Sequence, residues 1–146
     1  MSLRGLSAEG AYLDGISLKG ADLRYSNLRK ASLQKAAFQE ATLTNTNLQN
    51  ALLYEADFRK ANLQGVNFEG AVFNTEVAFG GEAVEGFVAV NPKPEDIFVG
   101  ANLSGANFKN TSVSRVAIEK GYLCNTTMPD GSKANRDCAY INSIDK

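Results

Sequence analysis

Large apolar residues recur at every fifth position along the first half of the chain. From Leu3 to Phe73, fourteen of the fifteen positions in this series hold Leu or Phe, and Ala8 is the exception. Two residues before most of them stands a small or β-branched residue, as at Ala21 and Thr46. The other three positions of each block are mostly polar. The pattern breaks off after residue 75, returns at residue 101 and weakens toward residue 123.

A period of five residues fits neither regular secondary structure. On an α-helix it would distribute the large residues over every face, and on a strand it would alternate them between the two faces. If each block instead forms one side of a square coil, four blocks complete a turn and both apolar positions point inward. The pattern therefore predicts an all-β solenoid, a right-handed quadrilateral β-helix of about five coils. Residue n then stacks on residue n+20, at about 4.8 Å.

Several blocks resemble the A(D/N)LXX consensus of the pentapeptide-repeat family. They are Ala21-Asp22-Leu23, Ala61-Asn62-Leu63, Ala101-Asn102-Leu103 and Ala106-Asn107-Phe108. The segment from Thr126 to Ser132, followed by a cysteine, is similar to the ending of cyanobacterial and thylakoid-lumen members. The resemblance implies a β-helix that works through its surface. Because some members mimic DNA and bind gyrase, it also implies an alternative function as a topoisomerase-binding protein.

The interruption between residues 75 and 101 allows two registers. If residues 76–100 loop out, Leu103 follows Phe58. If only 76–95 loop out, Phe98 continues the column of Phe38 and Phe58, and Phe108 lies on Phe68. The second register aligns aromatic residues twice and is preferred. It divides the chain into a solenoid (1–75), an inserted loop (76–95), a continued solenoid (96–125) and a C-terminal helical cap (126–146).

The function of the inserted loop has two open interpretations. Its apolar residues either fold back onto the solenoid wall or dock a protein partner, as long loops in repeat proteins often do. On the second interpretation, the contact residues are Phe79, Glu82, Glu85, Phe87 and Val88.

The two ends of the solenoid are expected to differ. After Asn125 a Pro-Asp-Gly turn is predicted to take the chain out of the repeat, and Ser132 then caps a helix. Ala134, Cys138 and Ile141 would share one face of that helix and cover the last coil. The N-terminal coil has no comparable cover, so we expect a monomer or a weak dimer through that coil.

The only two cysteines, Cys124 and Cys138, fall in the last repeat and the expected cap. A disulfide would fasten the cap to the solenoid and stabilise the fold by about 3 kcal/mol for a loop of this length. Two free thiols or half of a metal site are the alternatives, and the absence of His disfavours zinc. A disulfide indicates an oxidising compartment. The family resemblance then suggests the thylakoid lumen or the periplasm, reached by a leader absent from this sequence. A cytoplasmic location remains the alternative.

The composition offers little for catalysis. The chain has no His, and its net charge is −1 from 15 basic and 16 acidic residues. Ser, Thr or Cys nucleophiles therefore lack the usual base, and no charge excess favours nucleic acid. No apolar run is long enough to insert in a membrane. We expect neither an enzyme nor a cofactor or metal site.

These observations favour a structural or protein-interaction module with an unknown protein partner. Its contact surfaces would be the inserted loop and the flat faces of the solenoid. Tyr12, Leu52 and Tyr54 share one predicted face and form a mildly apolar strip. Gyrase binding by DNA mimicry is disfavoured, because it needs a long and strongly negative rod.

Overall fold

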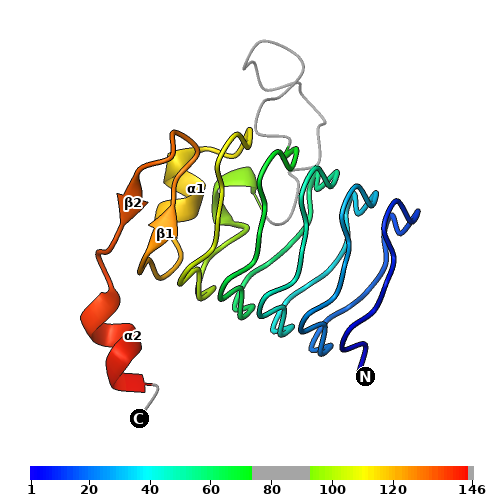
Figure 1. Cartoon of the computed structure of the whole chain (residues 1–146), viewed down its shortest axis with the longest axis horizontal. Coiled ribbons are helices and arrows are strands. Elements are labelled where there is room, and N and C mark those ends of the chain that lie inside the picture. Colours follow the sequence, from blue (N-terminus) through cyan, green and yellow to red (C-terminus); the bar gives the residue numbers. More distant parts are fainter. Residues whose placement is uncertain (74–92, 145–146) are drawn as a thin grey trace.

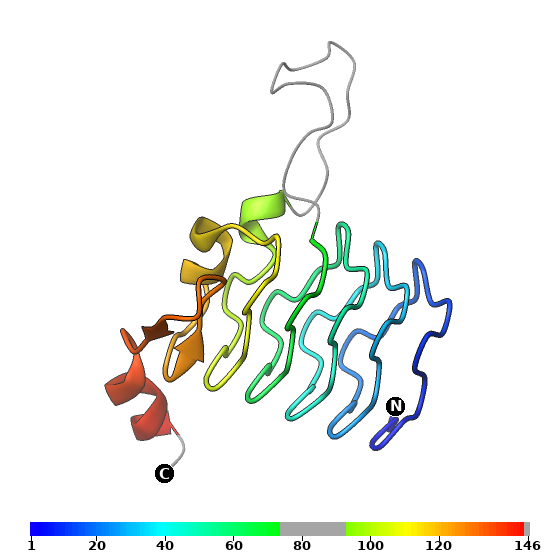
Figure 2. The same ribbon diagram turned by 45° about the horizontal axis from the view of Figure 1, so that its top comes forward.

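The computed structural model describes residues 1–73 and 93–144, and the described chain winds as a stack of four-sided coils (Figure 1). Parallel β-bridges link residues 20 positions apart, for example Ser2 to Asp22, Asp22 to Thr42 and Thr42 to Asn62. Each side contributes a single bridged residue between two turns, so the sides are straight but too short to form long strands. Figure 2 shows the coils edge-on as successive parallel layers.

Within each block, the five positions have separate roles, which we name the small, bridge, central and two corner positions. In block 21–25 these are Ala21, Asp22, Leu23, Arg24 and Tyr25. Ala21 and Leu23 are buried, with exposed fractions of 1% and 0%. The central Leu and Phe residues fill the axis of the coil, and the small residues allow neighbouring sides to approach. The inward positions predicted from the sequence therefore form the core.

Every backbone N–H of block 21–25 has an acceptor. The N–H of Ala21 donates across the turn to the Leu18 carbonyl (3.0 Å), and that of Asp22 donates to Met1 in the previous coil (3.0 Å). Leu23 and Tyr25 donate to the next coil, to the carbonyls of Thr42 and Thr44. The remaining N–H, of Arg24, donates to the Asp22 carboxylate at 3.2 Å.

This last hydrogen bond explains the Asp or Asn of the consensus. The N–H after a central residue points away from both neighbouring coils, and a carbonyl or carboxylate oxygen two residues earlier can accept from it. The same bond joins Asn47 to Gln49 (2.9 Å) and Asn107 to Lys109 (2.9 Å). The bridge residue therefore completes the hydrogen bonding of its own corner.

The second corner position requires left-handed backbone geometry. Its φ is positive throughout, as at Gly20 (69°) and Tyr25 (63°), which matches the third residue of a type II turn. Glycine adopts this conformation without strain. The chain nevertheless places other residue types there at ten positions: Tyr25, Lys30, Lys35, Glu40, Asn45, Asn50, Glu55, Lys60, Asn110 and Asn125.

The solenoid continues across the interruption in the second of the two registers. The rings of Phe58 and Phe98 stack with centroids 5.6 Å apart, and those of Phe68 and Phe108 at 4.8 Å. The Phe58 N–H donates to the carbonyl of Ile97 (3.0 Å). The short 3-10 helix η1 (Pro94–Asp96) leads back into this column.

The C-terminal part of the solenoid differs from the sequence expectation in three ways. Residues 115–119 form helix α1 (Arg115–Glu119), so Ile118 is buried from a helix and not from a repeat side. The repeat continues beyond Asn125, because Thr127 bridges Asn107 and Met128 is buried at the next central position.

The third difference concerns the expected cap helix. Strand β1 (Thr126–Thr127) pairs with β2 (Lys133–Ala134) in an antiparallel hairpin. Ala134 therefore lies on a strand, and Ser132 does not cap a helix, because the turn closes through the Met128 N–H and the Ser132 carbonyl at 2.8 Å. Helix α2 (Cys138–Ile144) begins only at Cys138.

The stacked aromatic core generates the first prediction. Phe58 is fully buried and contacts Phe38, Phe68 and Phe98. Replacing Phe58 by Ala leaves a cavity between coils and should lower the free energy of unfolding in urea by about 3–5 kcal/mol. The exposed control Lys19→Ala should change it by less than about 0.5 kcal/mol. A cost for Phe58→Ala as small as that of the control would contradict this account of the core.

Candidate interaction surface

One side of the solenoid carries apolar residues at bridge positions that face outward. Tyr12 bridges Ser32, Ser32 bridges Leu52, and Leu52 bridges Val72. Tyr12 is 83% exposed, and Leu52 and Val72 are half-buried. We call Tyr12, Leu52 and Val72 the apolar strip. Tyr54, which the sequence analysis placed with Tyr12 and Leu52, lies at the corner beside Leu52.

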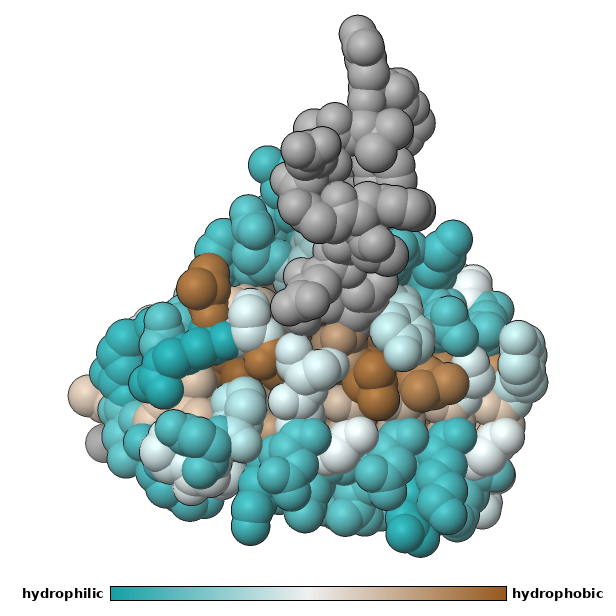
Figure 3. Space-filling model, turned by 90° about the horizontal axis from the view of Figure 1, so that it is seen from above, coloured by the Kyte–Doolittle hydropathy of each residue, from teal (hydrophilic) through white to brown (hydrophobic). Residues whose placement is uncertain are grey.

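Figure 3 views the molecule from the side on which the chain passes beyond Phe73. Hydrophobic residues form a band along the solenoid there, with hydrophilic residues on both margins. Two further apolar residues are exposed. Val99, which is 41% exposed, lies shortly after η1, and Val116, which is 59% exposed, lies in α1. Of the other three sides, two hold Ser, Thr, Asn or Asp at the corresponding bridge positions up to residue 107, and the fourth holds Ser17, Ala37 and Asp57. The apolar strip is therefore a local departure from the repeat.

The polar residues along the strip are mostly paired within the chain. The Asp14 carboxylate accepts hydrogen bonds from the Ser32 hydroxyl (2.6 Å) and the Gln34 N–H (3.0 Å). The Ser32 hydroxyl is the main cause that lowers the pKa of Asp14. Lys35 and Glu55 lie 3.9 Å apart across neighbouring coils. A partner that covers the strip would thus bury few charged groups that lack a pairing partner in the chain.

Carboxylates elsewhere on the solenoid are held by arginines. The Arg24 guanidinium lowers the pKa of Asp22 to about 2, helped by the Arg24 backbone N–H. Asp57 lies 2.6 Å from Arg59 and accepts a hydrogen bond from Gln39. Asp57 is only 4% exposed, because Arg59 and Gln39 cover it. Because its pKa is lowered to about 2, Asp22 is poorly suited to proton transfer near neutral pH.

The C-terminal end of the stack is closed by residues 132–138, which we call the C-terminal clasp. In an inner coil, the Leu103 N–H donates to the carbonyl of Tyr122 in the next coil. At the last coil, the Leu123 N–H instead donates to the Asp137 carboxylate at 2.9 Å. The Asn125 N–H donates to the Asn135 side-chain oxygen at 2.7 Å. Side chains of the clasp thus replace the carbonyls of a further coil.

Arg136 performs the complementary role as a donor. Its guanidinium donates to the carbonyls of Gly121 (2.7 Å) and Glu119 (2.9 Å). The same guanidinium donates to Asp137 and lowers the pKa of that carboxylate. Arg136 and Asp137 therefore pair with each other while each satisfies the backbone of the last turn.

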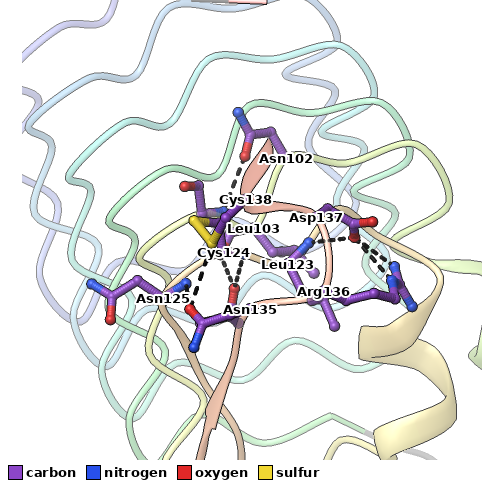
Figure 4. Close-up of a disulfide and its surroundings, with 11 residues drawn as sticks. Asn102, Leu103, Leu123, Cys124, Asn125, Asn135, Arg136, Asp137 and Cys138 are labelled. Carbon is purple, nitrogen blue, oxygen red and sulfur yellow. Dashed lines mark hydrogen bonds and ion pairs between the residues drawn. A yellow bond between two sulfur atoms is a disulfide. The ribbon is translucent and has the colours of Figure 1, made fainter. Parts of the chain in front are cut away.

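The disulfide fastens this clasp to the last coil (Figure 4). Cys124 and Cys138 are bonded, with their Cα atoms 4.7 Å apart, which is the pairing expected from the sequence. Next to it, the rings of Tyr122 and Tyr140 stack at 5.0 Å. Ile141 of α2 is 2% exposed.

The other residues predicted to act in binding, Phe79, Glu82, Glu85, Phe87 and Val88, lie outside the described residues. Within residues 1–73 and 93–144, no cluster of three or more His, Cys, Asp or Glu side chains is arranged to hold a metal ion. In the same part of the chain, no helix has both the length and the apolar character needed to cross a membrane. Of the apolar strip, the sequence analysis identified Tyr12 and Leu52 but not Val72.

Comparison with known proteins gives one family and several similar structures. The family model for pentapeptide repeats matches residues 2–39 and 36–74, with eight copies. A pentapeptide repeat protein from the thylakoid lumen of Arabidopsis thaliana is 26% identical over 90% of this chain and 83% of its own, with a TM-score of 0.48. A pentapeptide repeat protein from Nostoc PCC 7120 is 33% identical over 49% of this chain and 68% of its own, with a TM-score of 0.36.

A third similar structure is a trypsin-treated form of QnrB1, a plasmid-mediated fluoroquinolone resistance protein. It is 21% identical over 74% of this chain and 53% of its own, with a TM-score of 0.43. No curated protein matches the chain.

The Asp137 carboxylate predicts a pH dependence of stability. Because its pKa is lowered in the folded state, its contribution is complete above the unfolded pKa of about 3.9 and is lost as the pH falls through the folded value. Asp137→Asn should therefore destabilise the protein most near neutral pH. In thermal unfolding from pH 7 to pH 2, the difference in melting temperature from wild type should shrink toward the acidic end. A difference that is constant with pH would contradict this role.

The disulfide predicts a second effect on stability. Its two cysteines are separated by 14 residues, and opening a loop of this length should lower the free energy of unfolding by about 3 kcal/mol. The measurement is urea unfolding of the wild type with and without a reducing agent. The double variant Cys124→Ser/Cys138→Ser is the control and should show no effect of the reductant. Equal thiol labelling of the native wild type with and without reductant would show that the bond is absent.

Proposed function

Because the chain belongs to the pentapeptide-repeat family, whose members fold as a right-handed quadrilateral β-helix, we propose that it is a non-enzymatic module that binds a protein partner. The proposed contact surface is the side that carries the apolar strip. A repeat protein of this kind acts through extended flat surfaces. The partner itself is not identified by these features.

The observation that carries the proposal is the presence of Leu52 and Val72 at bridge positions. Asn or Asp at a bridge position accepts the N–H two residues later, as Asn62 does from Gln64 at 3.1 Å. Leu52 has no side-chain acceptor for the N–H of Tyr54. The fold therefore gains no hydrogen bond from leucine here, and an outward apolar residue is better explained by a contact with another molecule.

Residues 76–95 are proposed as the second part of this surface. The chain enters them shortly after Val72 of the apolar strip and leaves them within η1, which ends at Asp96. Their aromatic and acidic residues, with Phe79, Glu82, Glu85, Phe87 and Val88 as the proposed contacts, would then bind the same partner as the strip.

The C-terminal clasp and α2 are proposed to cap a post of about five coils. This cap would keep the last coil from pairing with other chains, since an open β-edge is a template for association. The disulfide favours an oxidising compartment, so we propose the thylakoid lumen or the periplasm over the cytoplasm.

The surface charges give no support to DNA mimicry, the alternative function. A DNA mimic presents a continuous negative surface to its topoisomerase. Here Arg24 lies beside Asp22, and Arg29 lies 3.7 Å from Glu9 on the neighbouring side. We therefore expect no protection of gyrase from its inhibitors in a supercoiling assay.

A double substitution to the consensus residue tests the proposed function. Leu52→Asn/Val72→Asn should retain the wild-type melting temperature, because Asn restores the side-chain acceptor at the corner. The same variant should recover the partner at least about tenfold less well in affinity capture from the native organism, followed by quantitative mass spectrometry. The matched control Asn47→Leu/Asn67→Leu changes a different side and should capture the partner normally.

A version without residues 76–95 separates the two parts of the surface. If it loses the partner while Leu52→Asn/Val72→Asn keeps it, the loop alone is the contact and the strip is not. If both variants recover the same proteins as the wild type, the proposed surface is wrong.

A further inference from the structure

The disulfide joins two parts of the chain that are held in different ways. Cys124 belongs to the last coil, and its carbonyl accepts the N–H of Gly105 in the preceding coil at 2.8 Å. Cys138 ends the C-terminal clasp and starts α2. Both cysteines are half-buried, so the bond lies at the surface and not in the core. Disulfides in such positions exchange with external thiols more readily than those enclosed in a core.

The solenoid side of the bond is held independently of it. The Thr127 N–H donates to the Ala106 carbonyl at 2.9 Å, and the buried Thr126 hydroxyl donates to the Leu103 carbonyl at 2.7 Å. Met128, only 1% exposed, fills the next central position. All of these contacts lie between coils. Opening the disulfide therefore leaves the last coil in place.

The clasp side of the bond has much weaker support. Ile141 is the only buried side chain among residues 132–143, for all of which the structure describes the burial. The contacts of the clasp with the last coil are mostly the hydrogen bonds of Asn135, Arg136 and Asp137. Hydrogen bonds at exposed positions compete with water, so each contributes little to holding a segment in order. The disulfide is thus the main attachment of the clasp.

The clasp determines which backbone groups the end of the solenoid presents. In the closed arrangement, the N–H and the carbonyl of Leu123 are hydrogen-bonded to Asp137, at 2.9 and 2.8 Å. The Asn125 N–H donates to the Asn135 side chain at 2.7 Å. Without the clasp these groups, and the Gly121 carbonyl, lose their partners. Such an edge is a template for pairing with other strands.

A dithiol reductant converts the closed arrangement into the open one by thiol–disulfide exchange. One thiolate of the reductant attacks a sulfur of the Cys124–Cys138 bond. That bond breaks, a mixed disulfide forms, and the other cysteine leaves as a thiolate that takes up a proton. The second thiol of the reductant then resolves the mixed disulfide. The reductant ends as a disulfide and both cysteines end as thiols, after the transfer of two electrons and two protons.

We propose that the Cys124–Cys138 bond is a redox switch that a dithiol reductant opens. Reduction separates residues 135–138 from the last coil and frees the edge at Leu123 and Asn125, while the solenoid keeps its fold. An oxidant that carries a disulfide reverses the exchange and closes the end again. The switch rests on the capping role proposed above for the clasp. It does not depend on the partner of the apolar strip.

Amide hydrogen exchange of the full chain tests the switch. The oxidised protein is compared with protein that dithiothreitol has reduced in native buffer, and thiol labelling verifies that both cysteines are free. Exchange at Leu123 and Asn125 should be at least about tenfold faster after reduction. Exchange at Asn102 and Asn107, whose N–H groups donate to the preceding coil, should not change.

The double variant Cys124→Ser/Cys138→Ser is the reference for the open state. Its exchange at Leu123 and Asn125 should be fast with and without dithiothreitol. Unchanged exchange at these two amides in fully reduced wild type overturns the switch. So does faster exchange along the whole solenoid, because the bond would then support the entire fold. A bond that dithiothreitol reduces only in urea concentrations that unfold the chain also overturns it.

A second variant separates the switch from the capping role. Asn135→Ala/Asp137→Ala removes both side-chain acceptors and should speed exchange at Leu123 and Asn125 with the disulfide intact. Asn142→Ala changes an exposed residue of α2 and is the matched control, with exchange as in the wild type. If the double variant exchanges like the wild type, the capping role is wrong and the switch with it. If it exchanges faster and reduction has no effect, only the switch is wrong.

Discussion

The hydrogen bonds between neighbouring coils, whose bridged residues lie 20 positions apart, determine the rest of the structure. They fix the coil length, and the coil length fixes which residues face the axis. Because three of the five N–H groups in a block bond to neighbouring coils and one closes the turn, only one is left over. The Asp or Asn of the repeat serves that last group. An outward apolar side chain at this position, such as Leu52, adds no hydrogen bond to the fold.

The sequence predicts the inward positions and the stacking that the five-residue period determines, and few of the contacts outside the repeat. The inward positions and the column of Phe58 with Phe98 follow from the phase of the repeat. The bond between Cys124 and Cys138 was one of three alternatives, considered because these are the only two cysteines. Helix α1 was missed, because Val113 and Ile118 remain in phase although the backbone between them has changed. Met128 was missed for the opposite reason: Pro129 and Gly131 signal a turn before the last side is complete. The clasp could not be foreseen, since Asp137 and Asn135 act on Leu123 and Asn125 through contacts that no period encodes.

The C-terminal end and the faces of the solenoid have different chemical character. At the C-terminal end, side chains of Asn135 and Asp137 accept the N–H groups that the carbonyls of a further coil would accept. Between the ends, two sides repeat polar residues at their bridge positions, a third carries Leu52 and Val72, and the fourth holds Ser17, Ala37 and Asp57. The binding that we propose is thus assigned to positions where the sequence departs from the repeat.

The direction of the coil-to-coil hydrogen bonds also has a mechanical consequence. All of them run along the solenoid axis, with no covalent cross-link in the described chain except at Cys124 and Cys138. A force applied across the axis loads a whole coil at once, in shear. A force that pulls on the N-terminus loads one short side at a time, so the post should peel open stepwise, in units of five residues. The disulfide holds the C-terminal clasp on the last coil and should resist opening from that end. Under such a force, we therefore expect the first coils to open before the last.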